Sequence, residues 1–135
     1  MAGWGTGSFE NDDAESWLRQ LGSLAVDDLH PLLSRAADNA DYLEAPESSV
    51  AITAAEAVAT LKGAPAAALP KEVADWAFKT KSNSGVGAIP SLASLAVRAI
   101  QRVRTNSELK DLWLQADGLN EWSANLRDLE KRLAD

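Results

Sequence analysis

The chain has no cysteine and only one histidine, His30, among its 135 residues. Without cysteine it can form neither a disulfide framework nor a thiolate metal site. A His/Cys zinc site and a di-iron bundle, which needs two Glu-x-x-His motifs, are excluded by the same count. A Ser-His-Asp triad would have to use His30, which precedes Pro31 and is expected on the surface at a helix start. Most catalytic constellations therefore fail on the residue inventory.

Long apolar runs are also missing. The apolar stretches are far shorter than the roughly 18 residues that a membrane-spanning helix needs, and no basic segment followed by an apolar one opens the chain. The sequence contains neither the Gly-x-x-x-x-Gly-Lys spacing of a phosphate-binding loop nor the Gly-x-Ser-x-Gly turn of a nucleophile elbow. We therefore expect a soluble cytoplasmic protein that has no membrane partner.

What the chain does have is an excess of acid, unevenly distributed within a net charge of −7. Residues 1–50 hold ten acidic residues against two arginines, net −8, and residues 51–106 hold three against seven lysines and arginines, net +4. The rest holds seven against four, net −3. Nucleic-acid-binding domains usually cluster their cations, so we expect no nucleic-acid partner. An acidic face suits a basic protein partner, and it equally suits solubility.

The most unusual stretch is the first seventeen residues, which read GWGTGSFENDDAESW from Gly3 to Trp17. Every second residue from Gly3 to Gly7 lacks a Cβ, so this backbone can approach another segment closely. Trp4 and Phe9 supply large apolar anchors. Trp4 can either plug the end of the protein or stand exposed as an anchor for a partner, and the first interpretation is favoured.

An acidic helix start follows this loop. Asn11 and Asp12 are both good N-cap residues, and Asp12 with Glu15 has the spacing of a capping box, so we expect a helix to begin here. Asp12, Asp13 and Glu15 would lie in its first turn, where carboxylates stabilise unpaired N–H groups. The alternative is that these carboxylates bind a cation or a basic partner beside the loop.

This opening segment resembles the signature of a bacterial family of small proteins known only as a domain of unknown function, number 4259. The resemblance extends to the stretch DYLEAPE at 41–47, to Ala-Ala-Glu at 54–56, and to the pattern of Leu109, Leu112, Trp113 and Trp122. It therefore covers nearly the whole chain. The resemblance implies a fold and a bacterial cytoplasmic setting, and it assigns no catalytic residue.

Apolar residues at helical spacing recur along the chain, and no stretch alternates with a period of two. We therefore predict an all-α fold, a single domain over residues 1–135 with six or seven helices and a Gly/aromatic N-terminal loop. The expected helices start at Asp12, at Asp27 or Asp28, at Pro46, at Lys71, at Pro90, after a Thr105–Glu108 capping box, and at Asn120. The second is expected to end near Tyr42, the third near Lys62 with Gly63 as its C′ residue, and the fourth near Lys81 before a loop at 82–87.

Two further features concern the surface and the core. Four tryptophans fall within apolar helical stripes, which favours core packing over a binding platform; they are Trp17, Trp76, Trp113 and Trp122. The helix that starts at Pro90 is expected to carry six apolar residues inward, namely Leu92, Leu95, Ala96, Ala99, Ile100 and Val103. Its arginines would lie on the opposite side, which gives the only basic helix face; they are Arg98, Arg102 and Arg104. The final helix places Trp122, Leu126, Leu129 and Leu133 in register, and the helix from Pro46 has mostly small apolar positions, namely Val50, Ala54, Ala57, Val58 and Leu61.

Carboxylate chemistry is the one enzymatic possibility left. Glu44-x-x-Glu47 and Glu72-x-x-Asp75 look like the acidic pairs of all-α nucleotide pyrophosphohydrolases, which hold Mg²⁺ against a triphosphate. However, Pro46 places the first pair across a helix start. Glu56 lies in the middle of an alanine-rich helix. An outward, solvated Glu56 is favoured, whereas an inward one would need a partner and would be a functional candidate.

The leading hypothesis is a non-enzymatic cytoplasmic protein-interaction module, regulatory or immunity-type, that binds a basic protein through its acidic N-terminal third and needs no cofactor. Its signature residues are Trp4, Phe9, Asn11, Asp12, Asp13 and Trp17. The alternative is a Mg- or Mn-dependent nucleotide pyrophosphohydrolase-like enzyme that uses Glu44, Glu47, Glu56, Glu72 and Asp75. A third possibility is a small-ligand pocket under the opening loop.

Overall fold

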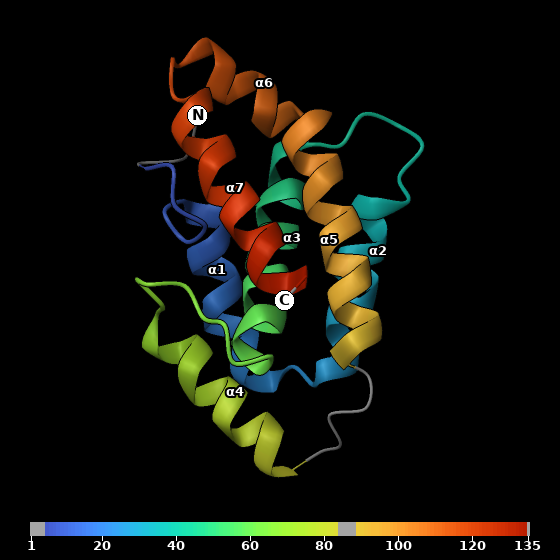
Figure 1. The fold of residues 1–135 in the computed structure, drawn as a ribbon, viewed down its shortest axis with the longest axis vertical. Helices are drawn as coiled ribbons and strands as arrows, with labels where there is room; N and C mark the ends of the chain where they lie inside the picture. Colours follow the sequence, from blue (N-terminus) through green and yellow to red (C-terminus); the bar gives the residue numbers. More distant parts are fainter. Residues whose placement is uncertain (1–4, 84–88, 135) are drawn as a thin grey trace.

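The computed structural model describes residues 5–83 and 89–134, and within these it contains seven α-helices and no strand, as predicted (Figure 1). The α-helices are α1 (Asp12–Gln20), α2 (Leu29–Ala37), α3 (Ala45–Leu61), α4 (Lys71–Asn83), α5 (Ile89–Thr105), α6 (Glu108–Gln115) and α7 (Leu119–Ala134). Two 3-10 turns, η1 (Leu21–Ser23) and η2 (Val26–Asp28), join α1 to α2. None of the helices described is both long enough and apolar enough to cross a membrane.

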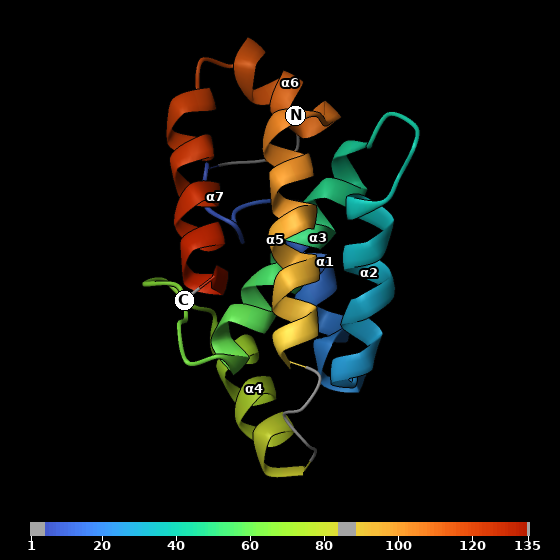
Figure 2. The same ribbon diagram turned by 45° about the vertical axis from the view of Figure 1, so that its right-hand side comes forward.

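Helix α3 is the centre of the molecule. It packs against α1, α2, α4, α5, α6 and α7. Figure 1 shows it behind α5 and α7, with α1 and α2 on either side, α6 at one end and α4 at the other; Figure 2 shows the same order from the side. Thirteen of its seventeen residues are buried, so it has no solvent face for most of its length.

The small side chains of α3 explain this position. Five of its alanines are fully buried, and alanine lets neighbouring helices approach closely from every side; they are Ala51, Ala54, Ala55, Ala57 and Ala59. The sequence pattern indicated mostly small apolar positions on this helix, which allow close helix–helix approach. The burial extends well beyond those positions, because neighbouring helices cover α3 on all sides.

The outer helices match their predicted stripes. In α5 every residue expected to face inward is buried: Leu92, Leu95, Ala96, Ala99, Ile100 and Val103. In α7 the same holds for Trp122, Leu126, Leu129 and Leu133. Each fully buried leucine or valine contributes roughly 1.5–3 kcal/mol of hydrophobic free energy, so these stripes hold the two helices on α3.

The start of α1 differs from the expected capping box. Asn11 is the N-cap, and its Oδ1 accepts a hydrogen bond from the backbone N–H of Ala14 at 2.8 Å. Asp12 is already the first helical residue, so the predicted pairing of Asp12 with Glu15 is wrong. Asn11 has the extended backbone of an N-cap residue (φ −157°, ψ 162°), and its side chain accepts from the third helical N–H, which sets the boundary of the helix.

Helix α2 starts later and ends earlier than its pattern suggested. Asp27 and Asp28 belong to η2, the helix begins at Leu29, and it ends at Ala37 instead of near Tyr42. The guanidinium of Arg102 in α5 donates to the carbonyls of Asn39 and Asp41, the latter at 2.6 Å. These bonds hold the segment after Ala37 as a loop, since both carbonyls are used outside a helix.

The end of α3 follows the prediction for Gly63. This residue has φ = 89°, in the left-handed region that favours glycine. The N–H of Ala64 donates to the carbonyl of Ala59 at 2.9 Å, and the N–H of Gly63 donates to that of Thr60 at 3.0 Å. These two bonds form a Schellman motif, which satisfies the last carbonyls of the helix.

The start of α6 corrects the predicted capping box at Thr105. Thr105 is the last residue of α5, and Ser107 is the N-cap of α6, accepting from the N–H of Lys110 at 3.1 Å. Glu108 instead accepts a hydrogen bond from the N–H of Ala45 at 2.7 Å. The carboxylate therefore satisfies an amide at the start of α3, sixty-three positions away in sequence.

Candidate functional site

The described part of the opening loop is a tight turn around a carboxylate. The N–H of Gly7 donates to Glu10 Oε1 at 3.0 Å, and the N–H of Glu10 donates to the carbonyl of Gly7 at 3.2 Å. A Cβ on Gly7 would lie 2.4 Å from that Oε1, so the exposed Glu10 side chain would have to move if Gly7 were replaced. The turn places Ser8 in a buried position, and Phe9, half-buried, packs against the core. Trp4, and with it the question of a plug or an anchor, lies outside the described residues.

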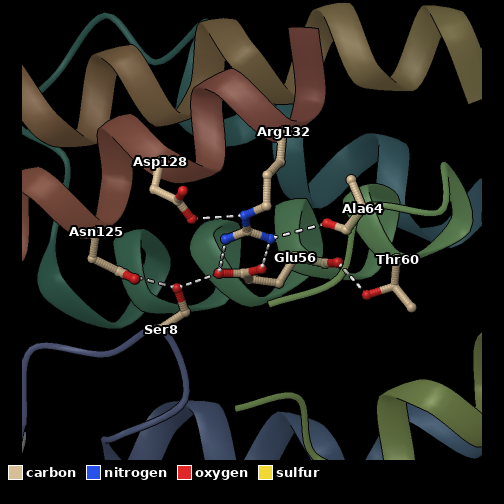
Figure 3. Close-up of polar contacts among 7 residues, drawn as sticks. All are labelled: Ser8, Glu56, Thr60, Ala64, Asn125, Asp128 and Arg132. Carbon is tan, nitrogen blue, oxygen red and sulfur yellow. Dashed lines mark hydrogen bonds and ion pairs between the residues drawn. The ribbon is translucent and has the colours of Figure 1, made fainter. Parts of the chain in front are cut away.

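Glu56 is fully buried at the middle of α3, so the favoured outward orientation was wrong. Its Oε2 accepts a hydrogen bond from the hydroxyl of Ser8 at 2.6 Å. Arg132 of α7 binds both carboxylate oxygens, at 2.8 Å and 3.2 Å (Figure 3). The inward Glu56 thus has the partners that burial demands, because an unpaired carboxylate would be very costly there.

The same cluster joins three parts of the chain. Asn125 of α7 donates from Nδ2 to the hydroxyl of Ser8 at 3.0 Å, so the opening loop is bonded to α7 as well as to α3. Arg132 also binds Asp128 Oδ2 at 2.8 Å and the carbonyl of Ala64 at 3.2 Å. We call Ser8, Glu56, Asn125, Asp128 and Arg132 the Glu56 network (Figure 3).

Arg132 keeps its charge inside the network. Burial lowers the pKa of Arg132, but the hydrogen bonds and charges of Glu56 and Asp128 raise it by more, so the net shift is upward. A guanidinium with a raised pKa stays protonated at any physiological pH. Glu56 is therefore a paired, neutralised carboxylate, which suits a structural role better than acid–base or metal chemistry.

The arginines of the predicted basic face on α5 bind groups of the same chain. Arg104 binds both oxygens of Glu130, at 2.6 Å and 3.2 Å, and Arg98 forms an ion pair with Asp38. The guanidinium of Arg102 donates to the backbone carbonyls of Asn39, Asp41 and Asn106. These three cations are thus already engaged by groups of the same chain.

The acids at the start of α1 differ from these cations. Asp12 and Glu15 are exposed and Asp13 is half-buried, all on α1. Among the described residues none of the three takes part in an ion pair. Asp27 and Glu47 are likewise without an ion pair in this part of the chain. A negative surface therefore remains available around α1 and the start of α3.

The residues of the metal alternative lie in different surroundings. Glu56 is buried against Arg132, Glu47 lines a groove beside α1, and Glu72 and Asp75 line another beside η2. Glu44 is exposed before α3. Within residues 5–83 and 89–134 no three or more Asp, Glu or His side chains come together as a metal site would require. The described residues give this alternative no support.

A hollow does lie under the opening loop, where a ligand pocket was considered. It is lined by the loop residues from Gly5 to Ser8 and by Trp113, Trp122 and Asn125, and its volume is about 50 Å³. That volume holds a few water molecules, whereas pockets for small ligands have roughly 300–1,000 Å³. This hollow is therefore too small for an organic ligand.

A larger groove lies between α1 and α2, with the first turns of α3 as its floor, and its volume is about 330 Å³. We call it the α1–α2 groove. Its lining residues are Asp13, Ser16, Trp17, Gln20, Leu32, Arg35, Pro46, Glu47 and Val50. It lies on the acidic side of the molecule, since Asp13 and Glu47 both line it.

Trp17 lines this groove and has a buried indole N–H without a hydrogen-bond partner among the described residues. The residue is 6% exposed and belongs to the core, as predicted, but its Nε1–H is the one buried side-chain polar group without a partner in the described residues. An unpaired buried donor costs about 1–3 kcal/mol. Trp76, also buried, donates instead to the carbonyl of Leu24 at 2.8 Å. Periodicity correctly placed both rings in the core, but it gives no information about hydrogen-bond partners.

The remaining tryptophans follow the core prediction in part. Trp122 is buried in α7, whereas Trp113 is half-buried and packs against the core from α6. The residues that sequence reasoning missed are Ser8 and Arg132, which bind Glu56, and Asn125, which binds Ser8. Each is polar and unremarkable in sequence, and each lies at least 48 positions from its partner.

These features define a class of protein: an all-α bundle whose N-terminal loop is bonded to two helices through a buried carboxylate. The family model described as Domain of unknown function (DUF4259) matches residues 3–125, so the chain belongs to that family, as its opening segment indicated. Neither the curated proteins nor the solved structures gave a match in the corresponding comparisons.

Proposed function

We propose that this protein is a non-enzymatic, cytoplasmic interaction module, of a regulatory or immunity type, that binds a basic protein partner through the acidic surface around α1. The observation that carries the proposal is the lack of ion pairs, among the described residues, at the acidic start of α1. Arg98, Arg104 and Arg132 are paired within the described chain, while Asp12, Asp13 and Glu15 are not. Charges left without internal partners are those that a partner protein can use.

The alternative explanation for these acids is local. Carboxylates in the first turn of a helix stabilise it by roughly 0.3–1 kcal/mol each when exposed. However, the N-cap of α1 is Asn11, whose side chain already satisfies the N–H of Ala14. The helix start is therefore capped by Asn11 without using the side chains of the three acids. The α1–α2 groove beside them offers an apolar floor next to the negative charge, which is the composition of a binding surface.

Affinity capture from cells of the native host, followed by affinity measurement with the purified partner, tests the proposal. We compare Glu15→Lys with Glu121→Lys, because both glutamates are exposed and lie in the first turn of a helix, α1 and α7 respectively. We expect binding to weaken with rising salt and with Glu15→Lys, and to persist with Glu121→Lys. A partner that binds both variants equally, or at high salt as well as at low salt, would overturn the proposal.

A further inference from the structure

A hollow of about 490 Å³ lies where α6 meets the end of α5 and the start of α7. The three helices contact one another, and α6 lies across the same end of α5 and α7 (Figure 2). Three cationic residues, one from each helix, line this hollow, and no acid of the described chain does; they are Arg104, Lys110 and Arg127. We call it the basic hollow. Thr105, Ser123 and Asn120 add hydroxyl and amide groups to its lining.

Arg104 is the fixed part of this lining. Its Nε and Nη2 donate to the two carboxylate oxygens of Glu130 at 2.6 Å and 3.2 Å, and the two side chains are only 20% and 13% exposed. Its Nη1 donates to no acceptor in the described chain. The guanidinium is therefore held in place with one nitrogen still able to donate, while Glu130 balances its charge.

Lys110 and Arg127 are the two cations of the basic hollow that have no counterion. Lys110 is half-buried on α6, and Arg127 is exposed on α7. Within residues 5–83 and 89–134 neither side chain takes part in an ion pair or donates a hydrogen bond. Because Glu130 balances Arg104, these two residues give the lining an excess of two positive charges, in a chain whose net charge is −7.

The acids closest in sequence to these two cations bind other groups. Four acids lie within three positions of Lys110 or Arg127, on α6 and α7. Each accepts a hydrogen bond from another residue: Glu108 from Ala45, Asp111 from Tyr42, Asp128 from Arg132 and Glu130 from Arg104. Lys110 and Arg127 therefore repel each other beside one hollow without a counterion, and a bound anion would remove that repulsion.

We propose that the basic hollow binds a phosphoryl group as a dianion. A phosphate monoester carries a charge of about −1.5 to −2 near pH 7 and three strong acceptor oxygens, which matches the two unbalanced cations, whereas a carboxylate would balance only one. Arg127 offers the planar pair of donors that fits phosphate, and Lys110 offers a compact charge. The hydroxyls of Thr105 and Ser123 are further donors in the same lining.

The size of the basic hollow fits a small phosphate ester as well as free phosphate. Pockets for small ligands have roughly 300–1,000 Å³, and a volume of about 490 Å³ lies within that range. None of the residues that line it belongs to the acidic surface of α1 or to the α1–α2 groove. The inference thus goes beyond the proposed function and does not depend on it.

The test titrates the ¹⁵N-labelled whole protein at neutral pH and constant ionic strength, and follows the backbone amide signals of Asn120 and Ser123 by NMR. The probes are inorganic phosphate and glycerol 3-phosphate, and the control anion is acetate, which has a single charge. We expect both phosphates to move these signals saturably at millimolar concentration and acetate to leave them in place. Tighter binding of the ester would identify a small ester as the ligand, and equal binding would identify free phosphate.

Matched variants assign the binding to the basic hollow. We expect Lys110→Gln and Arg127→Gln each to weaken phosphate binding about fivefold, which is the contribution of one partly exposed ion pair. The control Arg19→Gln removes an exposed arginine of α1 that also lacks an ion pair in the described chain, and it should leave the affinity unchanged. The amide spectrum of each variant verifies that it is folded.

Two results would overturn the inference. One is the absence of any shift of the Asn120 and Ser123 signals at millimolar phosphate, or an equal shift with acetate. The other is an affinity for phosphate that Lys110→Gln and Arg127→Gln change no more than Arg19→Gln does, because binding would then depend on net charge alone.

Discussion

The Glu56 network and the acidic surface of α1 use the same functional group in opposite ways. Glu56 is fully buried and accepts hydrogen bonds from Ser8 and Arg132, so its carboxylate connects the opening loop, α3 and α7. Asp12 and Glu15 are exposed and form no ion pair in the described chain. The difference indicates that one group of carboxylates maintains the fold and that the other is available to a partner.

Removing the charge of Glu56 should have the largest effect on stability. Glu56→Gln leaves Arg132 without its main partner in a site where the arginine side chain is only 15% exposed. Breaking a buried ion pair from one side costs about 3–5 kcal/mol, and we expect about 3 kcal/mol because Asp128 remains. Denaturant unfolding measures this free energy.

Two variants control that measurement. Glu15→Gln, at an exposed site, should change the free energy of unfolding by less than about 0.5 kcal/mol. The double variant Glu56→Gln/Arg132→Met should recover part of the loss, because it removes the unpaired guanidinium as well. Equal effects of Glu56→Gln and Glu15→Gln would show that the two groups of carboxylates do not differ in this way.

Detaching the opening loop should have the next largest effect. Ser8→Ala removes the hydrogen bond to Glu56 and the one from Asn125 in a buried position, which should cost about 1–2 kcal/mol. The matched control is Ser16→Ala, since Ser16 is exposed on α1. Unfolding free energies of both variants, with proteolysis of the loop as a second measurement, test whether the bond holds the loop. Identical behaviour of the two variants would contradict the proposed link.

Two variants at the start of α1 should show whether its carboxylates are needed to cap the helix. Asn11→Ala removes the side chain that accepts from the N–H of Ala14 and should cost about 1 kcal/mol. Asp12→Ala, one position later, should cost only a few tenths of a kcal/mol through the helix dipole. Thermal or denaturant unfolding provides the comparison. A larger loss for Asp12→Ala would restore the capping-box interpretation and weaken the case for free carboxylates.

The smallest expected effect on stability concerns Tyr42, which binds the half-buried carboxylate of Asp111. Its hydroxyl donates to Asp111 Oδ2 at 2.5 Å, and this hydrogen bond is the main cause that raises the pKa of Tyr42 from 10.0 to about 12. Because the folded pKa is raised, the contribution to stability is complete below pH 10 and is lost as the pH rises from 10 to about 12.

Tyrosinate absorbance reports this titration directly, since the chain has one tyrosine. We expect a midpoint near 12 in the wild type and a midpoint closer to 10 in Asp111→Asn. A wild-type midpoint at the ordinary value would mean that this exposed hydrogen bond does not persist in solution.

The sequence was most informative where one side of a helix meets the core. The leucines of α7 and the leucine and alanine stripe of α5 could be predicted, because these helices each have one buried face and period 3.6 reveals it. The same logic failed for α3. Burial on all sides comes from the small size of its alanines together with six surrounding helices, and no periodicity in α3 itself records those neighbours.

The candidate sites depended on contacts that local pattern does not contain. Glu56 was a candidate because it lies in the middle of an alanine-rich helix. Its partner Arg132 lies 76 residues away, and Asn125 lies 117 residues from Ser8, so no local pattern could reveal these contacts. The end of α2 was misplaced for the same reason, because Arg102 binds the loop from α5. The acidic start of α1 was visible in sequence, whereas the α1–α2 groove and the unpaired Trp17 N–H were not.

The most direct test of the difference between the buried Glu56 and the surface carboxylates of α1 is the affinity of the captured partner for Glu15→Lys. It is measured at low and at moderate salt, beside Glu121→Lys. We predict that Glu15→Lys, while still folded, binds about tenfold more weakly at low salt, equal to roughly 1.4 kcal/mol, and that added salt narrows the difference. Equal affinity of the two variants at low salt would contradict the claim that the surface carboxylates of α1 serve a basic partner.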